Sequence, residues 1–235
     1  MSKGRLILFP SLLAPVAPGD VLPRTNLELL GRVKFFVVEE LRTARRFLKA
    51  CDRSIDIDSL TFSVLNEHTP AEEVAAMLAP ALEGNDVGVV SEAGCPAVAD
   101  PGADLVAAAQ RAGIEVLPLV GPSSILLGLM ASGFNGQCFT FRGYLPVDAK
   151  ARAESFRHME REIRTRACTQ IFIETPYRNN RLLGELCAGL PGAMRLCVGL
   201  NITAPDQSIR TLTLAQWKSL NPDLGKKPAI FLLYN

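Results

Sequence analysis

The sequence predicts an α/β protein, because short apolar runs alternate with helix-forming segments along the first half of the chain. Loops rich in glycine or proline follow three of these runs, near Pro10, Gly94 and Ser123. A mainly parallel sheet brings such loops together at the carboxyl ends of its strands, where ligands usually bind. A chain of 235 residues is long enough for two domains. We place the boundary near Pro146, which gives domains 1–146 and 147–235.

The composition is that of an ordinary globular protein, with 48% hydrophobic residues, 21% charged residues and a net charge of +1. With so small a net charge, only local clusters of Lys and Arg can attract a nucleic acid. Six scattered cysteines, with no C-x-x-C and no His at metal spacing, indicate reduced intracellular thiols and no metal site. No stretch reaches the roughly 18 apolar residues of a spanning helix, so we expect a cytoplasmic protein without a membrane partner.

The first strand is expected at residues 6–9, where four apolar residues precede Pro10. Three further prolines exclude a helix directly after it, namely Pro15, Pro18 and Pro23. A short helical turn at 26–30 and a strand at 33–38 follow. Residues 42–48 then form a basic helix, and such a helix most often has a solvated face. Its cations are Arg42, Arg45, Arg46 and, just beyond, Lys49.

A weaker strand candidate covers 60–65, and a well-signalled helix follows it. Thr69 fits its N-cap, Pro70 its first position and Glu72 a capping box, so the helix is expected to run from Pro70 to about residue 82. A buried strand follows at 87–90.

After the next loop, helix formers extend from 103 to 112 and end at Gly113. Another buried strand is expected at 114–120, followed by a helix at 125–131 that Gly133 ends.

The second half begins with a change of direction at 139–146 and a polar helix at 150–166. This helix carries six Lys or Arg against three acids. The remaining elements are a helix near 180–188 and strands at 170–173, 195–200, 209–212 and 229–233.

The loop at 91–102 has the sequence S-E-A-G-C-P followed, after three residues, by D-P-G. One interpretation is an ordinary connection between a strand and a helix, with Asp100 as N-cap and Pro101 as the first helical residue. The other is a ligand site, since Gly94 lets a ligand approach main-chain atoms that a Cβ would cover.

Several common sites are excluded by the motifs. No G-x-G-x-x-G follows a strand and no P-loop motif is present. Ile125 stands where the second glycine of a G-x-S-x-G elbow must be, which argues against a serine hydrolase. The two histidines, His68 and His158, lie far apart, so neither a triad nor a metal site is supported.

Six segments in order resemble the tetrapyrrole methylase superfamily, in particular its branch of ribosomal small-subunit RNA 2′-O-ribose methyltransferases. The loop at 91–102 is similar to the family's S-D-A-G-T-P-x-x-x-D-P-G signature. The other five matches are V-E-E-L-R at 38–42, N-E-H-T at 66–69, V-G-P-S-S at 120–124, G-Y-L-P at 143–146 and E-T-P-Y-R at 174–178.

The resemblance implies two α/β domains, the second with a mixed sheet, commonly as a homodimer, with S-adenosylmethionine in the cleft between the domains. Family proteins hold this cofactor largely through main-chain groups. The matching positions here are Pro10, Gly94, Cys95, Val98, Ala99, Ser123, Ser124, Glu174 and Pro228. The resemblance also suggests substrate contacts from Arg42, Glu67, His68 and Arg178.

Two segments depart from the family. Its first loop reads P-x-P-x-G-N-L, whereas residues 10–16 here lack the glycine and the asparagine. Of the family's motif R-E-L-T-K, which lies late in the chain, only the threonine is present here, as Thr203. Thr203 and Gln207 instead resemble a T-x-x-x-Q pattern found more widely in the superfamily. Both departures put the RNA substrate in doubt more than the cofactor.

Methyl transfer from a sulfonium is a direct displacement, so alignment and exclusion of water matter most. A ribose hydroxyl must also lose its proton, and a carboxylate within hydrogen-bond reach can accept it. Glu92 is our first candidate for this base and Glu40 the second. The structural alternative is that Glu92 only accepts hydrogen bonds from loop amides.

Three functions stay open on the sequence. The first is methylation of a ribose in small-subunit ribosomal RNA, with basic residues of 42–49 and 150–166 on phosphates. The second is C-methylation of a tetrapyrrole such as uroporphyrinogen. The third is a module that binds the cofactor without turnover, which the altered first loop motivates.

Overall fold

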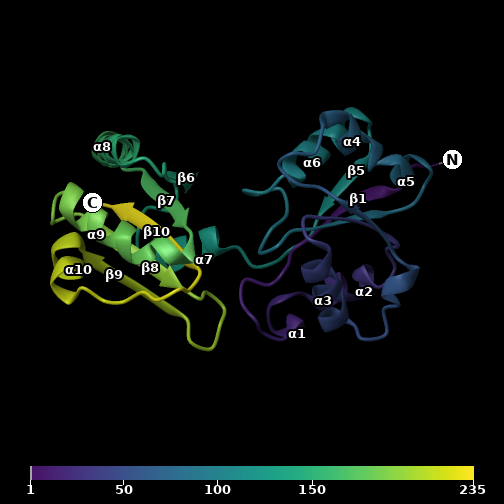
Figure 1. Ribbon diagram of the computed structural model, residues 1–235, viewed down its shortest axis with the longest axis horizontal. Coiled ribbons are helices and arrows are strands. Elements are labelled where there is room, and N and C mark those ends of the chain that lie inside the picture. Colours follow the sequence, from purple (N-terminus) through teal and green to yellow (C-terminus); the bar gives the residue numbers. More distant parts are fainter. Residues whose placement is uncertain (1) are drawn as a thin grey trace. The chain divides into compact units, whose positions relative to one another are not determined.

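The computed structural model describes residues 2–235, and the chain divides into two compact units between Ser123 and Ser124 (Figure 1). We call 1–123 the N-terminal unit and 124–235 the C-terminal unit, and each is described by itself. This division lies earlier in the chain than the expected boundary near Pro146. No helix among residues 2–235 is long and apolar enough to cross a membrane.

The N-terminal unit is built on a parallel five-stranded sheet, as the alternation of strands and helices predicts. Its strand order is β3-β2-β4-β1-β5. The strands are β1 (Arg5–Phe9), β2 (Phe35–Val38), β3 (Thr61–Val64), β4 (Val87–Val90) and β5 (Glu115–Pro118).

Helices cover both faces of this sheet (Figure 1). One face packs on α4 (Ala71–Ala76), α5 (Ala79–Leu82) and α6 (Gly102–Arg111). The other packs mainly on α2 (Arg24–Leu30) and α3 (Leu41–Cys51). Because both faces are covered, the central strands are continuous apolar runs and β4 is buried along its whole length.

The strand order creates a switch point between β1 and β4. The chain leaves β1 and passes beyond β4 to reach β2, whereas it leaves β4 and passes beyond β1 to reach β5. The loops after these two neighbouring strands therefore diverge, and such a crevice is where open α/β sheets bind ligands.

Two helices in this unit differ from expectation. No helix follows β1 directly, as the prolines predict, but the sequence analysis missed α1 (Pro18–Val21), one turn with Pro18 in its first position, where the missing N–H costs nothing. The expected helix from Pro70 to 82 is split into α4 and α5, with Pro80 in the first turn of α5. Thr69 does not cap α4 but accepts a hydrogen bond from the Asn66 amide at 3.0 Å.

The C-terminal unit has a mixed five-stranded sheet in the order β6-β7-β10-β8-β9. The first pair is parallel and the others are antiparallel. The strands are β6 (Phe139–Tyr144), β7 (Thr169–Glu174), β8 (Arg195–Leu200), β9 (Ser208–Thr213) and β10 (Ala229–Tyr234). The segment expected to change direction at 139–146 is thus mostly strand.

One face of this sheet packs on α8 (Ala149–Arg166), α9 (Asn179–Gly189) and α10 (Leu214–Leu220). The sequence analysis missed α10, although its capping box of Thr213 and Gln216 is a recognisable signal. On β8, β9 and β10 packs α7 (Ser124–Ser132), whose Gly128 approaches Ile230 and Leu232. These contacts of α7, and the pairing of β6 with β7, explain why the division lies before α7 and not at Pro146.

A nearly buried ion pair fastens α8 to α9 in the C-terminal unit. The Arg152 side chain is 4% exposed and donates two hydrogen bonds to Glu185, at 2.5 and 2.8 Å, and two more to the carbonyls of Pro146 and Val147. The guanidinium holds the pKa of Glu185 below its ordinary value.

Replacement of Glu185 by Ala is expected to destabilise the protein by about 3 kcal/mol, because it leaves the Arg152 charge buried without its partner. Urea unfolding measures this difference. A matched control is Glu162→Ala, which breaks the more exposed pair with Arg166 and should cost less than about 1 kcal/mol. Since the pKa of Glu185 is lowered, its contribution is present at neutral pH and is lost as the pH falls through that pKa. If both variants lose the same free energy of unfolding, the buried Arg152 charge does not depend on Glu185.

Candidate functional site

Three loops of the N-terminal unit meet at the carboxyl ends of β1, β4 and β5, as the sequence predicts. The Ser11 amide donates to the Gly94 carbonyl at 2.8 Å, across the switch point. Gly121 lies so close to the ring of Pro10 that a Cβ would overlap it. The Cys95 thiol lies 3.6 Å from the Pro122 carbonyl oxygen. The loops near Pro10, Gly94 and Ser123 therefore form one edge.

The loop after β4 holds an unusual backbone. Gly94, Ala97 and Ala99 all have left-handed φ angles, of +74°, +64° and +60°. For alanine this conformation costs roughly 1–2 kcal/mol per residue. Asp100 offsets part of that cost, because its Oδ1 accepts from the amides of Ala97 at 2.9 Å and Gly102 at 2.7 Å.

The predicted cap is shifted: α6 begins at Gly102 with Pro101, not Asp100, as its N-cap, and Asp100 stabilises the helix start from one residue further out through the Gly102 amide. Residues 94–99 belong to no helix or strand. The Gly94 carbonyl and the Ala97 amide are bonded to Ser11 and Asp100, and the other main-chain groups of this loop are available to a ligand.

The two candidate bases differ in their surroundings. Glu40 caps α3, since its carboxylate accepts from the Thr43 amide at 2.6 Å and from the Thr43 hydroxyl at 3.0 Å. Hydrogen bonds from main-chain amides lower the pKa of Glu40. Partial burial raises the pKa of Glu92, and the nearby Glu40 charge adds to this, against a hydrogen bond from Thr43. A raised pKa makes Glu92 the stronger base of the two.

A third carboxylate, Glu39, belongs to the same group, and the sequence analysis missed it. Partial burial raises the pKa of Glu39, and the negative charges of Glu92 and Asp100 raise it further. Its position directly after β2 was the available signal. Within residues 2–235, no three His, Cys, Asp or Glu side chains are arranged to hold a metal ion.

A cavity of about 400 Å³ lies beside Glu92, between the first loop, α3 and the end of β4. We call it the first-loop cavity. Its lining is mostly apolar, and two buried serines, Ser11 and Ser91, contribute hydroxyls. The Ser11 hydroxyl has no hydrogen-bond partner among the described residues. The remaining lining residues are Leu12, Leu13, Ala14, Pro15, Thr43, Ala44, Arg46, Phe47, Ala50, Val90, Glu92 and Ala93.

In the C-terminal unit, Glu174 and Pro228 lie at one edge of the sheet. Ala229 pairs with Glu174 on one side and with Leu200 on the other, and the Asn201 amide donates to the Pro228 carbonyl at 3.0 Å. The Glu174 carboxylate is already engaged, since it accepts from Thr175 and from Arg178.

The loop after β8 at this edge is strained. Thr203 has φ +77°, rare for a β-branched residue, and its amide donates to the Gln207 side chain at 3.0 Å. The spacing of Thr203 and Gln207 was visible in the sequence, but nothing local indicates the left-handed backbone.

Most of the other predicted residues lie in exposed positions, whereas Ser123 and Ser124 are half-buried. Glu67 and His68 are on a turn, with their side chains 3.6 Å apart and more than four-fifths exposed. Val98 is half exposed. Arg42 projects from the first turn of α3, and Ser123 and Ser124 stand at the junction where α7 begins.

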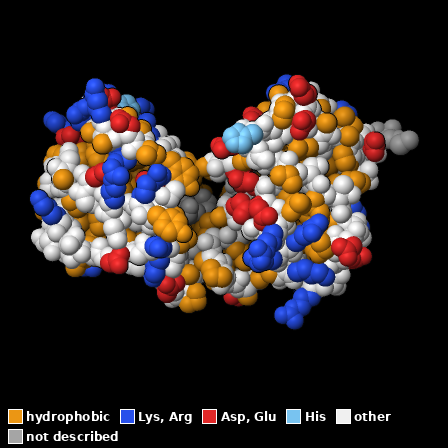
Figure 2. Space-filling model, in the orientation of Figure 1, with side chains coloured by type: hydrophobic (Ala, Val, Ile, Leu, Met, Phe, Trp, Pro, Cys, Tyr) orange, Lys and Arg blue, Asp and Glu red, His pale blue; other side chains and the backbone are white. Residues whose placement is uncertain are grey.

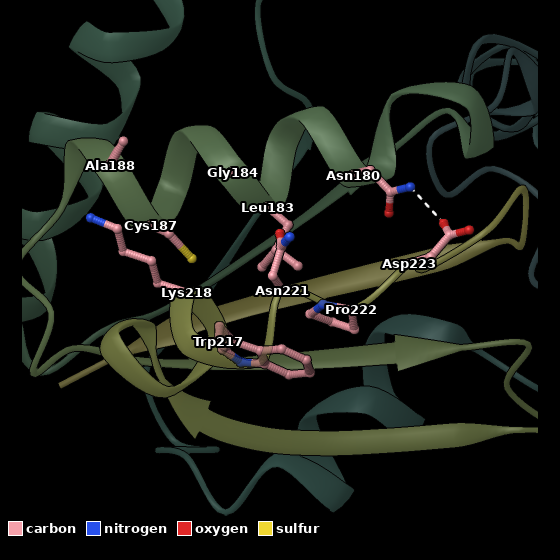
Figure 3. A pocket seen from close by; sticks show the side chains of 10 residues that line it. All are labelled: Asn180, Leu183, Gly184, Cys187, Ala188, Trp217, Lys218, Asn221, Pro222 and Asp223. Atoms are coloured by element: carbon pink, nitrogen blue, oxygen red, sulfur yellow. Dashed lines mark hydrogen bonds between the residues drawn. The ribbon is translucent and has the colours of Figure 1, made fainter.

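A second cavity, of about 420 Å³, lies between α9 and α10 (Figure 3). None of the predicted site residues lines it. The polar side chains at one end of this cavity bond to each other, since the Asn180 side-chain amide donates to Asp223 at 2.6 Å. This cavity is therefore a weaker candidate than the edge that carries Glu92.

The residues of the first edge fit the cofactor that the resemblance implies. The loop at 94–99 is not committed to regular structure, and the amides of Cys95, Val98 and Ala99 have no hydrogen-bond partner within residues 2–235. These groups would hold S-adenosylmethionine through its polar atoms.

Residues 14–218 match the family model of the tetrapyrrole (corrin/porphyrin) methylases. The chain is 31% identical over 219 residues to ribosomal RNA small subunit methyltransferase I of Vibrio cholerae, covering 92% of this chain and 73% of that protein. It is 36% identical over 180 residues to the protein of the same name from Xylella fastidiosa, covering 77% of this chain and 62% of the relative.

Solved structures share the fold at low identity. The methyltransferase CobJ has a TM-score of 0.64 at 20% identity, covering 99% of this chain and 95% of that one. Uroporphyrin-III C-methyl transferase from Thermus thermophilus, complexed with S-adenosyl homocysteine, has a TM-score of 0.60 at 17% identity, covering 99% and 98%. With the family match over most of its length, the chain belongs to the tetrapyrrole methylase family and is an S-adenosylmethionine-dependent methyltransferase.

Proposed function

We propose that this methyltransferase acts on a ribose 2′-hydroxyl of small-subunit ribosomal RNA. The observation that carries the proposal is the similarity to proteins named ribosomal RNA small subunit methyltransferase I, which extends over 77–92% of this chain in the two relatives described above. The carboxylate of Glu92, at the loop that matches the family signature, supports a hydroxyl acceptor, since such an acceptor has a proton to lose.

The chemistry assigns a distinct task to each group. When bound, S-adenosylmethionine supplies an electrophilic methyl group on a positively charged sulfur. Glu92 would accept the proton that the ribose hydroxyl loses on methylation. The exposed Glu92 then releases this proton to water. The loop at 94–99 contributes alignment, which can supply much of the rate in a direct displacement.

Two basic helices support a polyanionic substrate. On α8, Lys150, Arg157, Arg161 and Arg164 are all exposed and follow the spacing of one helical face. The Arg164 guanidinium lies as far as 4.0 Å from the Glu160 carboxylate, so this ion pair is weak. The exposed face of α8 therefore keeps much of its positive charge. In Figure 2 blue side chains also gather over α3 of the N-terminal unit, with red side chains beside them. Binding through such faces should weaken steeply with added salt.

A methylation assay on small ribosomal subunits that lack the modification tests the proposal. With labelled S-adenosylmethionine we expect label in a dinucleotide that resists alkaline hydrolysis, because a methylated 2′-oxygen cannot attack the neighbouring phosphate. Label on a base, or transfer only to uroporphyrinogen, would refute ribose methylation and favour the other acceptors. Cofactor binding without any transfer would leave only the binding-module alternative.

We also propose a homodimer. The helix α7 is apolar on all sides, and Leu126 and Met130, one turn apart, are 52% and 79% exposed. A helix of this kind is normally covered on every side. Sedimentation velocity should give twice the chain mass of 25.4 kDa, and a monomer at micromolar concentration would refute this. A cytoplasmic location remains a prediction, to be checked by cell fractionation.

A further inference from the structure

The first-loop cavity combines features that a small apolar ligand would not require. Leu12, Leu13 and Phe47 form apolar walls, while Ser11 and Ser91 are buried at 3% and 7% exposure. The Ser11 hydroxyl has no partner within residues 2–235. A buried hydroxyl without a partner is costly unless a ligand satisfies it. The occupant should therefore be flat and apolar on its faces and polar at its edge.

The rim of the cavity carries charge of both signs. Glu92 and Arg46 both belong to its lining, together with Thr43. Its neighbour Arg45 is engaged differently, since its guanidinium lies 5.5 Å from the centre of the Phe62 ring. Arg46 itself forms no ion pair with a described acidic side chain. It is thus free to meet an anionic group of a ligand.

Positive charge continues along α3 beyond the cavity. Arg42, Arg46 and Lys49 are exposed at spacings of four and three residues, on one side of α3, and Arg53 is exposed just beyond the helix end at Cys51. At 1.5 Å per residue the three helical cations span about 10 Å. A single small anion would use only one of these cations, whereas a chain of phosphates would use several.

We infer that the first-loop cavity receives the base of an unpaired nucleotide, with Arg46 on its phosphate and with Glu92 at its ribose. This inference rests on the proposed function and adds where the acceptor nucleotide binds. The volume of about 400 Å³ is at the low end of ligand sites, which suits one nucleoside and is small for a substituted tetrapyrrole ring. Enzymes that modify nucleotides commonly extrude the target base into such a pocket and read its edge by hydrogen bonds.

The test compares two probes of equal charge by fluorescence anisotropy, without methyl transfer. One is a labelled pyrimidine RNA octamer, and the other is an octamer of abasic spacers with the same phosphates. The wild type should bind the RNA at least about tenfold more tightly than the abasic chain, since base stacking adds affinity. Ala50→Phe fills the cavity from an exposed helical position and should bring RNA affinity down to the abasic level.

Matched controls separate the cavity from general effects. Ala107→Phe places the same ring on exposed α6, away from the cavity, and should behave as the wild type. Arg46→Gln should lower the affinity for the RNA and for the abasic chain by the same factor and should reduce the salt dependence of binding. Arg111→Gln on α6 should change neither. Calorimetry with S-adenosylhomocysteine should give the same affinity for Ala50→Phe and the wild type.

Two outcomes would overturn the inference. If Ala50→Phe keeps the tenfold preference for RNA over the abasic chain, no base enters the cavity. If Ala50→Phe loses S-adenosylhomocysteine instead, the cavity belongs to the cofactor. Either result leaves the proposed function standing when the wild type methylates small ribosomal subunits, whereas failure of that assay with intact cofactor binding refutes the proposed function itself.

Discussion

Replacement of Glu92 by Gln is expected to lower kcat by about 10²- to 10⁴-fold while leaving cofactor affinity unchanged. Glutamine keeps the size of the side chain but cannot take the proton of the acceptor hydroxyl. The raised pKa of Glu92 makes the wild-type carboxylate a stronger base than an ordinary one. Single-turnover methylation of small ribosomal subunits measures the chemical step, and calorimetry with S-adenosylhomocysteine measures the affinity.

The pH dependence gives a second readout of the same assignment. A base must be ionised, so the wild-type rate should fall as the pH drops through the pKa of Glu92, which lies above the ordinary value of 4.5. The rate of the Glu92→Gln variant should not show this fall at low pH. The control is Glu40→Gln, which keeps an acceptor for the α3 cap and should retain most of the rate. If Glu40→Gln lowers the methylation rate more than Glu92→Gln does, Glu40 and not Glu92 is the base.

Replacement of Gly121 by Ala is expected to weaken cofactor binding by at least about tenfold and to destabilise the protein by about 1–3 kcal/mol. The new Cβ would overlap the Pro10 ring, so the loops after β1 and β5 would have to separate. The carboxyl-end edge of the sheet would then no longer hold its loops at the distance that the cofactor requires. Calorimetry with S-adenosylhomocysteine and urea unfolding measure the two effects.

Gly19→Ala is the matched control in the same unit, because a Cβ at Gly19 has nothing within 4 Å. It should leave both affinity and stability nearly unchanged. If Gly121→Ala lowers stability but binds S-adenosylhomocysteine as the wild type does, the close approach of Pro10 and Gly121 is structural only. The cofactor site would then have to be sought among other residues.

Local patterns predicted much of the N-terminal unit because its strands are buried on both faces. A strand such as β4 reads as a continuous apolar run, and Gly113 and Gly133, with φ of +61° and +73°, end the helices that they follow. The split between α4 and α5 was harder to see, because Pro80 is compatible with a new first turn. The boundary at Ser123 was missed since it depends on which sheet α7 packs against.

Some features of the candidate site could likewise be predicted from the sequence, and others could not. The loop at 91–102 and its role at a sheet edge follow from sequence, since the strand order brings every carboxyl end of a parallel sheet to one side. The first-loop cavity does not, because Leu12, Phe47 and Glu92 belong to three separate segments. The contrast between Glu92 and Glu40 also required the structure, since a capping hydrogen bond decides which carboxylate has the lowered pKa.

The sequence by itself determined the α/β class, the parallel sheet of the first unit and the family, because each depends on short-range periodicity or on motifs in fixed order. Only the tertiary structure decided where the units divide, which alanines are forced into left-handed conformations and which carboxylate is suited to accept a proton. These properties depend on contacts between residues far apart in the chain, such as Pro10 with Gly121 and Ser11 with Gly94.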